Sequence, residues 1–361
     1  MNFVLLEEGK ARFWAPDPAK YADPANAPVF YNRYMARNRY ISILVLDAFS
    51  RIEGRKLDVC EPLSATGIRG IRYALETNAV GRLVLNDLSK AAVEVIRKNL
   101  ELNGVSAEVY NEDASILLRR LRGECDVVDL DPFGSPAPFA ESAFQAIRDG
   151  GLLCATATDT AVLVGNYREK ALRRYGVRLS KTPFYVEVGL RALLSFLARA
   201  AAANDFALEP LIAYWERHYF RFCGKVVKGA RDASDSLRKL AYLEVRRGYR
   251  LVSGAGKPSS IGPLWVGELG DAAFISELAE RAEEEGARRL LSTLALEYSV
   301  SRPWYYLTHE LGDLKIGVSE LVRRLGEYGI HAAPTHMSPQ GFKAEADYGE
   351  LLILAQRLGR W

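Results

Sequence analysis

Short apolar runs alternate with amphipathic segments between residue 57 and about residue 156. This alternation is typical of a parallel sheet whose strands are connected by crossover helices. The helix expected at 89–102 has the clearest signal, because its apolar residues recur at helical spacing and Asn103-Gly104 provides a stop signal. The predicted strands are 57–60, 82–86, 107–110, 125–130 and 151–157, and the predicted helices are 67–77, 89–102, 114–121 and 138–148.

The pattern changes after a further predicted helix at residues 185–203. Residues 210–227 are rich in aromatic and β-branched side chains, which favours two antiparallel strands. The basic, Gly- and Ser-rich segment 228–260 is typical of a loop or linker. The pattern beyond it predicts helices at 272–286, 288–299 and 318–328 and strands near 304–308 and at 330–335. We therefore expect an α/β fold, with a doubly wound domain over residues 1–229 and a smaller α+β domain over residues 230–361.

Composition and charge narrow the class of protein. The 361 residues are 49% hydrophobic and 26% charged, as in ordinary globular proteins, and the net charge of +3 is too small to indicate a polyanionic partner. The four cysteines form no CxxC pair, which argues against a disulfide framework or a thiolate zinc site and fits a reducing compartment. The N-terminus lacks the basic region of a signal peptide, and the most apolar later segment, 189–203, contains Arg191 and Arg199. We therefore expect a cytoplasmic protein that neither is secreted nor spans a membrane.

Candidate cofactor residues follow the first three predicted strands. The turn EPLSATGIRG at 61–70 consists largely of small residues, which let a ligand approach the backbone where a parallel strand ends. Asp87 follows the second strand, where a carboxylate can accept hydrogen bonds from ribose hydroxyls, and Asp113 follows the third, where one can accept from an adenine amino group. Each aspartate alone is more often a helix N-cap. Together, without GxGxxG or GxxxxGK[ST], they favour S-adenosylmethionine over a nucleotide.

The fourth predicted strand leads into DLDPFGSP at 129–136, the candidate catalytic motif. Asp131, Pro132 and Phe133 provide a carboxylate, a rigid backbone carbonyl and an aromatic ring beside the cofactor pocket. Methyl transfer to an exocyclic amine needs such acceptors, because the lone pair of the nitrogen is delocalised into the base and positive charge develops on it. The alternative is a helix start with Asp131 as the cap and Pro132 at the first helical position, which leaves the aromatic residue and the second proline unexplained.

These motifs resemble a known family. DLDPFGSP, SATGIR at 64–69 and FYNRYMARNRYIS at 30–42 resemble the tRNA (guanine-26-N2)-dimethyltransferases of archaea and eukaryotes. The resemblance continues through KGARDASDSL, GPLWVGEL and THMSPQGFKAEA, and therefore covers most of the chain. It implies a class I, Rossmann-like methyltransferase domain followed by a C-terminal domain, with S-adenosyl-L-methionine as cofactor and tRNA as partner.

The resemblance also assigns roles to individual residues. It implies cofactor contacts from Arg39, Arg69, Asp87, Asp113 and Ala114. Asp131 would be the catalytic acceptor, and Phe30 and Phe133 would hold the base. Many members of the family carry a cysteine-rich insert before GPLW that resembles a zinc ribbon. This chain has SGAGKPSSIGPLW there, so no metal is implied.

A basic segment lies between residues 214 and 257, with eleven lysines and arginines against four acidic residues. Tyrosine, tryptophan and phenylalanine residues are interleaved with them, which suits binding to a phosphate backbone and unpaired bases. The candidate substrate contacts in this segment are Arg231, Arg246 and Arg247. The alternative is a solvated face that covers a sheet core.

Two other functions remain open at this stage. Asp-Pro-aromatic alone also fits an adenine-N6 methyltransferase that acts on DNA, and a non-catalytic RNA-binding protein could retain an unused cofactor pocket. The four histidines show no metal-ligand spacing, and we assign them no chemistry. The sequence does not fix the oligomeric state, and we expect a monomer.

Overall fold

The structure is a computed structural model that describes residues 3–358 apart from 22, 313 and 315. Two units are distinguished within it. The N-terminal unit comprises residues 1–157, 223–228 and 281–283, and the C-terminal unit comprises residues 158–222, 229–280 and 284–361. The units do not follow the predicted boundary at residue 229, because α8 packs with β8, α9 and β12. As a division of function, the predicted boundary stays a prediction.

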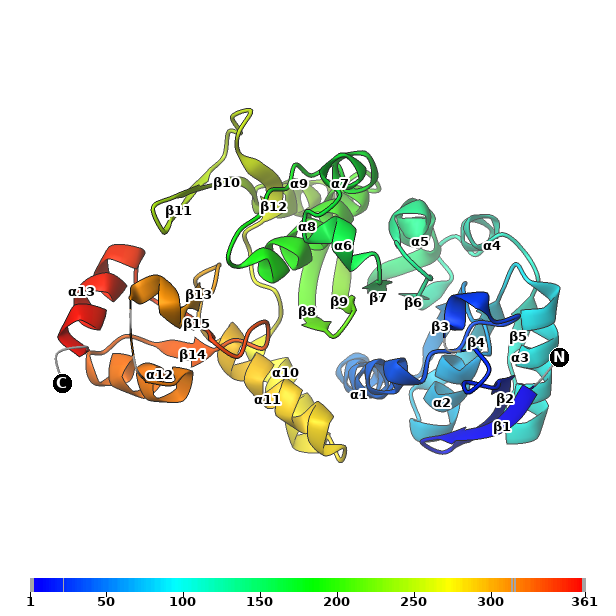
Figure 1. Ribbon diagram of the computed structural model, residues 1–361. Helices are drawn as coiled ribbons and strands as arrows, with labels where there is room; N and C mark the ends of the chain where they lie inside the picture. Colours follow the sequence, from blue (N-terminus) through cyan, green and yellow to red (C-terminus); the bar gives the residue numbers. More distant parts are fainter. Residues whose placement is uncertain (1–2, 22, 313, 315, 359–361) are drawn as a thin grey trace. The chain divides into compact units, whose positions relative to one another are not determined.

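The N-terminal unit is built on a parallel sheet (Figure 1). Its strands in chain order are β3 (Leu57–Glu61), β4 (Val80–Asn86), β5 (Glu108–Tyr110), β6 (Cys125–Leu130) and β7 (Ile147–Ala157). They lie in the order β5-β4-β3-β6-β7, followed by residues 223–228 of β9 (Tyr219–Lys228). The strand order reverses between β3 and β6, and ligands of such doubly wound sheets bind beyond the carboxyl ends of the strands at that point.

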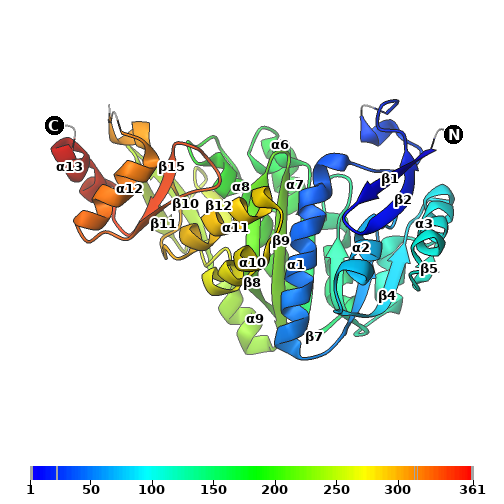
Figure 2. The same cartoon turned by 90° about the horizontal axis from the view of Figure 1, so that it is seen from below.

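Helices and a hairpin complete the N-terminal unit. The helices are α1 (Ala36–Glu53), α2 (Ile68–Glu76), α3 (Lys90–Asn103), α4 (Ala114–Arg120) and α5 (Ala140–Ala146), with short 3-10 turns η1 (Pro24–Asn26), η2 (Arg33–Met35) and η3 (Ala137–Phe139). Ser89 caps the start of α3, and Gly104 ends it with a φ of 61°. The hairpin of β1 (Phe3–Glu8) and β2 (Ala11–Pro16) packs against α2 and α3 (Figure 2).

The C-terminal unit mixes helices with small antiparallel sheets. Its helices are α6 (Thr160–Leu163), α7 (Arg168–Tyr175), α8 (Tyr185–Ala202), α9 (Ala230–Leu237), α10 (Ala272–Arg281), α11 (Glu285–Tyr298), α12 (Val318–Glu327) and α13 (Tyr348–Leu358), with the 3-10 turn η4 (Thr308–Leu311). Its strands are β8 (Phe206–Glu216), the start of β9, β10 (Leu240–Arg246), β11 (Tyr249–Ser253), β12 (Ile261–Trp265), β13 (Tyr306–Leu307), β14 (Ala332–Pro334) and β15 (Gly341–Ala344). The sheets have the orders β11-β10-β12 and β13-β15-β14, and β8 lies beside β9.

The C-terminal unit buries a cluster of charged side chains. Glu187 of α8 pairs with Arg191 at 2.8 Å and with Lys343 of β15 at 3.3 Å. Glu297 of α11 pairs with Lys343 at 3.2 Å and with His336 at 2.6 Å. Burial disfavours the charged form, yet His336 and Lys343 hold the pKa of Glu297 at about 2. His336 is therefore a core residue with a partner inside the fold.

Most predicted elements of the first half are confirmed, whereas the expectations for residues 228–260, for residues 138–148 and for the cysteines are wrong. Residues 228–260 are not a linker, because buried Ala233, Ala241 and Leu243 fix α9 and β10 in the fold, while the basic side chains other than that of Arg250 take exposed positions. The predicted helix 138–148 ends at residue 146, because Ile147 already pairs with Cys125 of β6. The hairpin β1–β2, α1 and α13 were not predicted.

The third wrong expectation concerns the cysteines. Cys154 of β7 and Cys223 of β9 form a disulfide bond, with their Cα atoms 4.1 Å apart. The two residues are 69 positions apart in the sequence, and only the packing of the strands brings them together. Cys60 and Cys125 are free and buried. Within the described part of the chain, no helix is long and apolar enough to cross a membrane.

Candidate active site

The turn after β3 is fixed to the tips of the neighbouring strands. Asn86, at the end of β4, donates from Nδ2 to the carbonyl oxygens of Pro62 at 2.9 Å and Glu112 at 3.0 Å, and so ties together the ends of three strands. The backbone N–H of Ala65 donates to Asp87 Oδ2 at 2.9 Å. Ala65 has a φ of 48°, a left-handed backbone conformation that residues other than glycine rarely adopt. The turn is therefore held in one shape, with small side chains at its surface.

Asp87 and Asp113 lie at successive strand tips, as predicted. Asp87 accepts one backbone hydrogen bond on each oxygen, from Ala65 and from Ser89. Asp113 caps α4, accepting on Oδ1 from the N–H groups of Ser115 at 2.9 Å and Ile116 at 3.2 Å. The N-cap role considered for such residues is therefore observed for Asp113. Because both N–H groups donate to Oδ1, the lone pairs of Asp113 Oδ2 can accept hydrogen bonds from a ligand.

Two exposed apolar side chains flank these carboxylates. Leu88, directly after Asp87, is 70% exposed, and Ile116, in the first turn of α4, is 62% exposed. Apolar surface beside hydrogen-bond acceptors fits a ligand that carries a flat ring and a ribose. The residues present thus fit an adenosine-bearing cofactor. Leu88 and Ile116 were not predicted, because their only signal in the sequence is their position close to the predicted aspartates.

Asp131 lies at the end of β6 and forms a charge-assisted hydrogen bond with Arg69 Nη2. The Asp131 side chain is 25% exposed, whereas that of Arg69 is 6% exposed. Asp131 does not begin a helix, since the next helical turn, η3, starts at Ala137 after Pro136. The helix-cap alternative is therefore wrong, and the carboxylate of Asp131 remains directed at Arg69 at the carboxyl end of the sheet.

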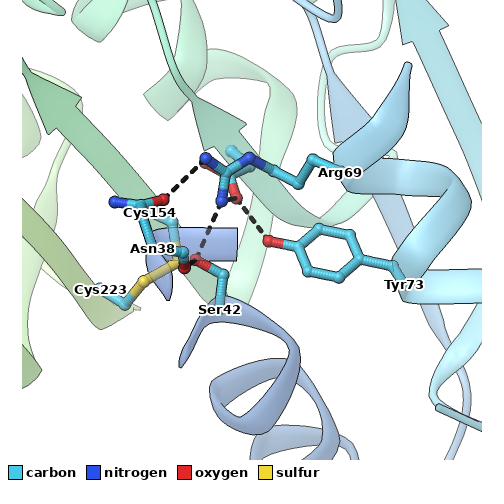
Figure 3. The surroundings of a disulfide bond; sticks show 7 residues. Asn38, Ser42, Arg69, Tyr73, Cys154 and Cys223 are labelled. Carbon is cyan, nitrogen blue, oxygen red and sulfur yellow. Dashed lines mark hydrogen bonds and ion pairs between the residues drawn. A yellow bond between two sulfur atoms is a disulfide. The ribbon is translucent and has the colours of Figure 1, made fainter. Parts of the chain in front are cut away.

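Arg69 is held from several sides (Figure 3). It donates to Asn38 Oδ1 at 2.7 Å and to Ser42 Oγ at 2.9 Å, both on α1, and it lies 3.7 Å from Asp129. Tyr73 donates to Asp129 at 2.7 Å. Burial disfavours the charge of Arg69, yet Asp131 and Asp129 raise its pKa well above the usual value. The guanidinium is therefore a fixed cation.

Asn38, Ser42 and Tyr73 were not predicted, because their roles depend on contacts that only the fold creates: Asn38 and Ser42 accept from Arg69, and Tyr73 donates to Asp129. The one sequence signal was the pair of polar residues at i and i+4 of α1, which are buried at 0% and 3% exposure. Glu61 was part of the predicted turn without a role of its own. Its carboxyl is buried at the end of β3, and burial, with Asp129 and Asp131 adding to it, raises its pKa to about 8 although Arg69 opposes the shift.

Phe133 projects from the loop after β6 with 70% of its surface exposed, which is unusual for a phenylalanine. Its ring centroid lies 5.4 Å from that of Phe30, and the ring planes are inclined by 53°. Pro132, between Asp131 and Phe133, is buried. Phe30 and Phe133, the predicted base-holding residues, are therefore in contact, and Phe133 lies two residues after Asp131, the predicted acceptor.

Comparison with known proteins shows the family of the chain. Residues 9–355 match the family of N2,N2-dimethylguanosine tRNA methyltransferases. The tRNA (guanine(26)-N(2))-dimethyltransferase of Pyrobaculum aerophilum is 53% identical over 358 residues, which are 99% of this chain and 97% of the relative. The enzyme of the same name from Thermococcus kodakarensis is 39% identical, over 97% of this chain and 98% of the relative. The chain belongs to the N2,N2-dimethylguanosine tRNA methyltransferases.

A solved structure supports the fold of this family member. Trm1 from Pyrococcus horikoshii, in complex with S-adenosyl-L-methionine, is 34% identical and superposes with a TM-score of 0.88. The match covers 98% of this chain and 99% of that one. The predicted class I methyltransferase fold with a separate C-terminal domain is therefore confirmed.

Arg39 is a predicted cofactor residue whose guanidinium already has a partner. Its Nε donates to Glu8 Oε1 at 2.6 Å, and Nη2 donates to the carbonyl oxygen of Asn32 at 3.2 Å. Ala114, which follows the capping Asp113, is buried at 3% exposure, so its backbone and not its small side chain is the part a ligand would approach.

The predicted stacking surface of the basic segment is wrong for most of its aromatic residues, although Tyr249 is exposed. Four of its aromatic side chains are fully buried, because β8 and β9 form part of the core: Tyr214, Tyr219, Phe220 and Phe222. Arg221 is buried as well, and the buried Arg250 side chain pairs with Glu310 at 2.9 Å. Arg231, Arg246 and Arg247 are exposed, as a phosphate contact requires. Among the described residues, no group of three or more His, Cys, Asp or Glu side chains could hold a metal ion.

Proposed function

We propose that the protein transfers methyl groups from S-adenosyl-L-methionine to the exocyclic N2 of guanine 26 in tRNA, giving N2-methylguanosine and N2,N2-dimethylguanosine. The observation that carries the proposal is the carboxylate of Asp131, paired with the buried Arg69 and two residues from the exposed ring of Phe133. An acceptor and a stacking ring side by side are what methyl transfer to the amino group of a base requires.

Base capture comes first in the proposed reaction. The target guanine leaves its stack in the tRNA and lies against the rings of Phe30 and Phe133, whose centroids are 5.4 Å apart. The exposure of Phe133 provides the free apolar surface for this contact.

Asp131 then acts on the amino group. Its carboxylate and the backbone carbonyl of Pro132 accept hydrogen bonds from the N–H groups of N2, which directs the nitrogen lone pair away from the ring system. When bound, S-adenosyl-L-methionine supplies an electrophilic methyl group, which forms a bond to N2 as its bond to sulfur breaks. The negative charge of Asp131 stabilises the positive charge on the amine. The surplus proton passes to Asp131 and on to water, because that side chain is 25% exposed.

The cofactor residues follow from the strand tips. Asp87 binds the ribose hydroxyls with its remaining lone pairs, and Asp113 with Ala114 binds the adenine, whose faces Leu88 and Ile116 can cover. Arg39 and Arg69 complete the cofactor contacts. Arg231, Arg246 and Arg247 contact the tRNA backbone from the C-terminal unit. The reaction takes place in the cytoplasm.

Methyl transfer to different nucleic acids tests the proposal. The protein is incubated with labelled S-adenosyl-L-methionine and either an unmodified tRNA transcript or duplex DNA. We expect label in the tRNA only. Label in the DNA would favour adenine-N6 transfer, and cofactor binding without transfer to any tRNA would overturn the catalytic role.

A further inference from the structure

Glu8, which lies outside the predicted motifs, is at the centre of a buried hydrogen-bond cluster. Its Oε1 accepts from Arg39 Nε at 2.6 Å and from Arg72 Nη1 at 2.7 Å. Its Oε2 accepts from Arg39 Nη2 at 2.5 Å and from the hydroxyl of Tyr31 at 3.2 Å. One carboxylate at the end of β1 thus joins α1, α2 and the segment that precedes η2.

The cluster is balanced in charge and shielded from water. The side chains of Glu8, Arg39 and Arg72 are 9%, 6% and 4% exposed. Arg72 also donates to Glu76 at 2.6 Å and 2.9 Å, so that two carboxylates match two guanidinium groups. Burial disfavours the charge of Glu8, but its hydrogen bonds with Arg39 and the charges of both arginines lower its pKa below the usual value. Glu8 is therefore charged in the folded protein, and Arg39 and Arg72 depend on it for their hydrogen bonds.

The hairpin that carries Glu8 is itself fixed to the unit. Gly9, in its turn, has a φ of 57°, and a Cβ there would meet Glu76 Oε1 at 2.1 Å and Arg72 at 2.7 Å. The backbone N–H of Lys10 donates to Glu76 at 3.1 Å. On β2, the N–H and carbonyl of Trp14 both bond to Asn99 of α3. Glu8 is therefore a rigid attachment point.

Tyr31 connects Glu8 to Phe30, one of the two proposed base-holding residues. Its ring packs edge-on against Phe13 of β2 at 5.1 Å, and Arg39 lies 5.4 Å from its centroid. Burial, with the charge of Glu8 adding to it, raises the pKa of Tyr31 to about 12, so its hydroxyl stays protonated and donates to Glu8. Phe30 directly precedes Tyr31, and its ring contacts that of Phe133.

We propose that Glu8 is a positioning residue for base capture, because it holds Tyr31 and thereby sets Phe30 against Phe133. The inference rests on the proposed function, since it concerns the same site. Glu8 touches neither substrate nor cofactor in this role. Glu8 also binds Arg39, a proposed cofactor residue, so its effect on tRNA is measured at saturating S-adenosyl-L-methionine. Under that condition Glu8 acts through Phe30, and its effect must disappear when the ring of Phe30 is absent.

A double-mutant cycle tests this coupling. Stacking of one base on an aromatic ring contributes roughly 5- to 150-fold in affinity, so we expect Glu8→Gln to lower kcat/KM for tRNA about tenfold while kcat changes little. In a Phe30→Ala background the same substitution should change kcat/KM less than about twofold. Tyr31→Phe, which removes one hydrogen bond and no charge, should give a smaller effect with the same dependence on Phe30. Equal effects of Glu8→Gln with and without Phe30 would overturn the inference.

Glu7→Gln is the matched control, because Glu7 precedes Glu8 on β1, is 76% exposed and pairs only loosely with Arg12 at 3.5 Å. It should leave kcat/KM unchanged.

A second readout does not depend on activity. Hydrogen–deuterium exchange of residues 28–35 in the free protein should become faster in Glu8→Gln and stay unchanged in Glu7→Gln. Unchanged exchange in both variants would contradict the inference. The two proposals can fail separately. If the wild type does not methylate tRNA but Glu8→Gln still accelerates exchange, the proposed function is wrong, while Glu8 still positions residues 28–35.

Discussion

Asp131 and Phe133 are two residues apart in one loop, yet the fold gives them opposite surroundings. Asp131 is tied to a buried cation that three further side chains hold in place, whereas Phe133 is 70% exposed. A carboxylate needs a fixed partner to accept a proton in one geometry, and a stacking ring needs free surface. The motif alone showed which residues carry the chemistry. It did not show that Arg69 organises them.

Replacing Asp131 by asparagine should affect the chemical step more than binding. Asp131→Asn keeps the size and one carbonyl acceptor but removes the charge that stabilises the cationic amine. A positioned acid or base contributes typically about 10²–10⁴ in rate, so kcat should fall by that order while tRNA affinity changes little. Single-turnover transfer of labelled methyl, with tRNA binding measured separately, checks this. Asp47→Asn, a surface aspartate paired with Arg51 on α1, is the control. A near wild-type rate for Asp131→Asn would remove it from the mechanism.

Glu61 should make the stability of the protein depend on pH. Its pKa in the folded protein is about 8, against 4.5 for an ordinary glutamate. Between these values the folded protein binds more protons than the unfolded chain, so this contribution to stability is greatest at low pH and is lost as the pH rises through 8. Glu61→Gln cannot titrate, and we expect its Tm to fall less than that of the wild type between pH 5 and pH 8.5. Glu94→Gln, exposed on α3, should behave as the wild type. The same slope in all three proteins would contradict the assignment.

The strands of the N-terminal unit follow from local pattern, because most are short apolar runs and helices such as α3 have recognisable start and stop residues. The strand-tip residues Asp87, Asp113 and Asp131 could therefore be predicted. The hairpin β1–β2 could not, since its role depends on contacts of Glu8 and Trp14 with residues far along the chain. The aromatic residues of β8 and β9 carried a misleading signal, because stacking surfaces and core strands have the same composition.

The disulfide between β7 and β9 is a second feature that only the fold could show. Intracellular proteins of hyperthermophilic archaea are an exception to the rule that cytosolic proteins lack disulfides, so the bond does not contradict the cytoplasmic location that we propose. We expect Cys154→Ala with Cys223→Ala to lower the free energy of unfolding by about 2–4 kcal/mol.

Thermal or denaturant unfolding, with and without a reductant, measures this effect. The reductant should destabilise the wild type and leave the double variant unchanged. Equal stability of the oxidised wild type and the double variant would show that the bond contributes nothing.

Positive charge is concentrated in part of the molecule although its net charge is only +3. Arg246 and Arg247 lie at the turn of the hairpin β10–β11, where Arg247 adopts a φ of 49° and Gly248 one of 86°. Such a turn projects its side chains into solvent. This position suits contact with the phosphates of a large RNA.

Affinity for tRNA should therefore fall steeply with salt. The logarithm of the binding constant should decline by up to about 0.9 for each tenfold rise in salt concentration and each phosphate neutralised. Arg246→Ala with Arg247→Ala should weaken tRNA binding and flatten this slope without changing cofactor affinity. Arg97→Ala with Lys98→Ala, an exposed basic pair on α3, should leave the slope as in the wild type. An unchanged slope in the Arg246/Arg247 variant would show that this hairpin is only solvated surface.

Mass spectrometry of nucleosides tests the central claim most directly. An unmodified tRNA transcript with guanine at position 26, and a second transcript with adenine there, are incubated with the protein and S-adenosyl-L-methionine and then digested. The account predicts N2-methylguanosine at early times and N2,N2-dimethylguanosine later from the first transcript, and neither from the second. The same methylated guanosines from both transcripts, or a methylated adenosine from either, would contradict it.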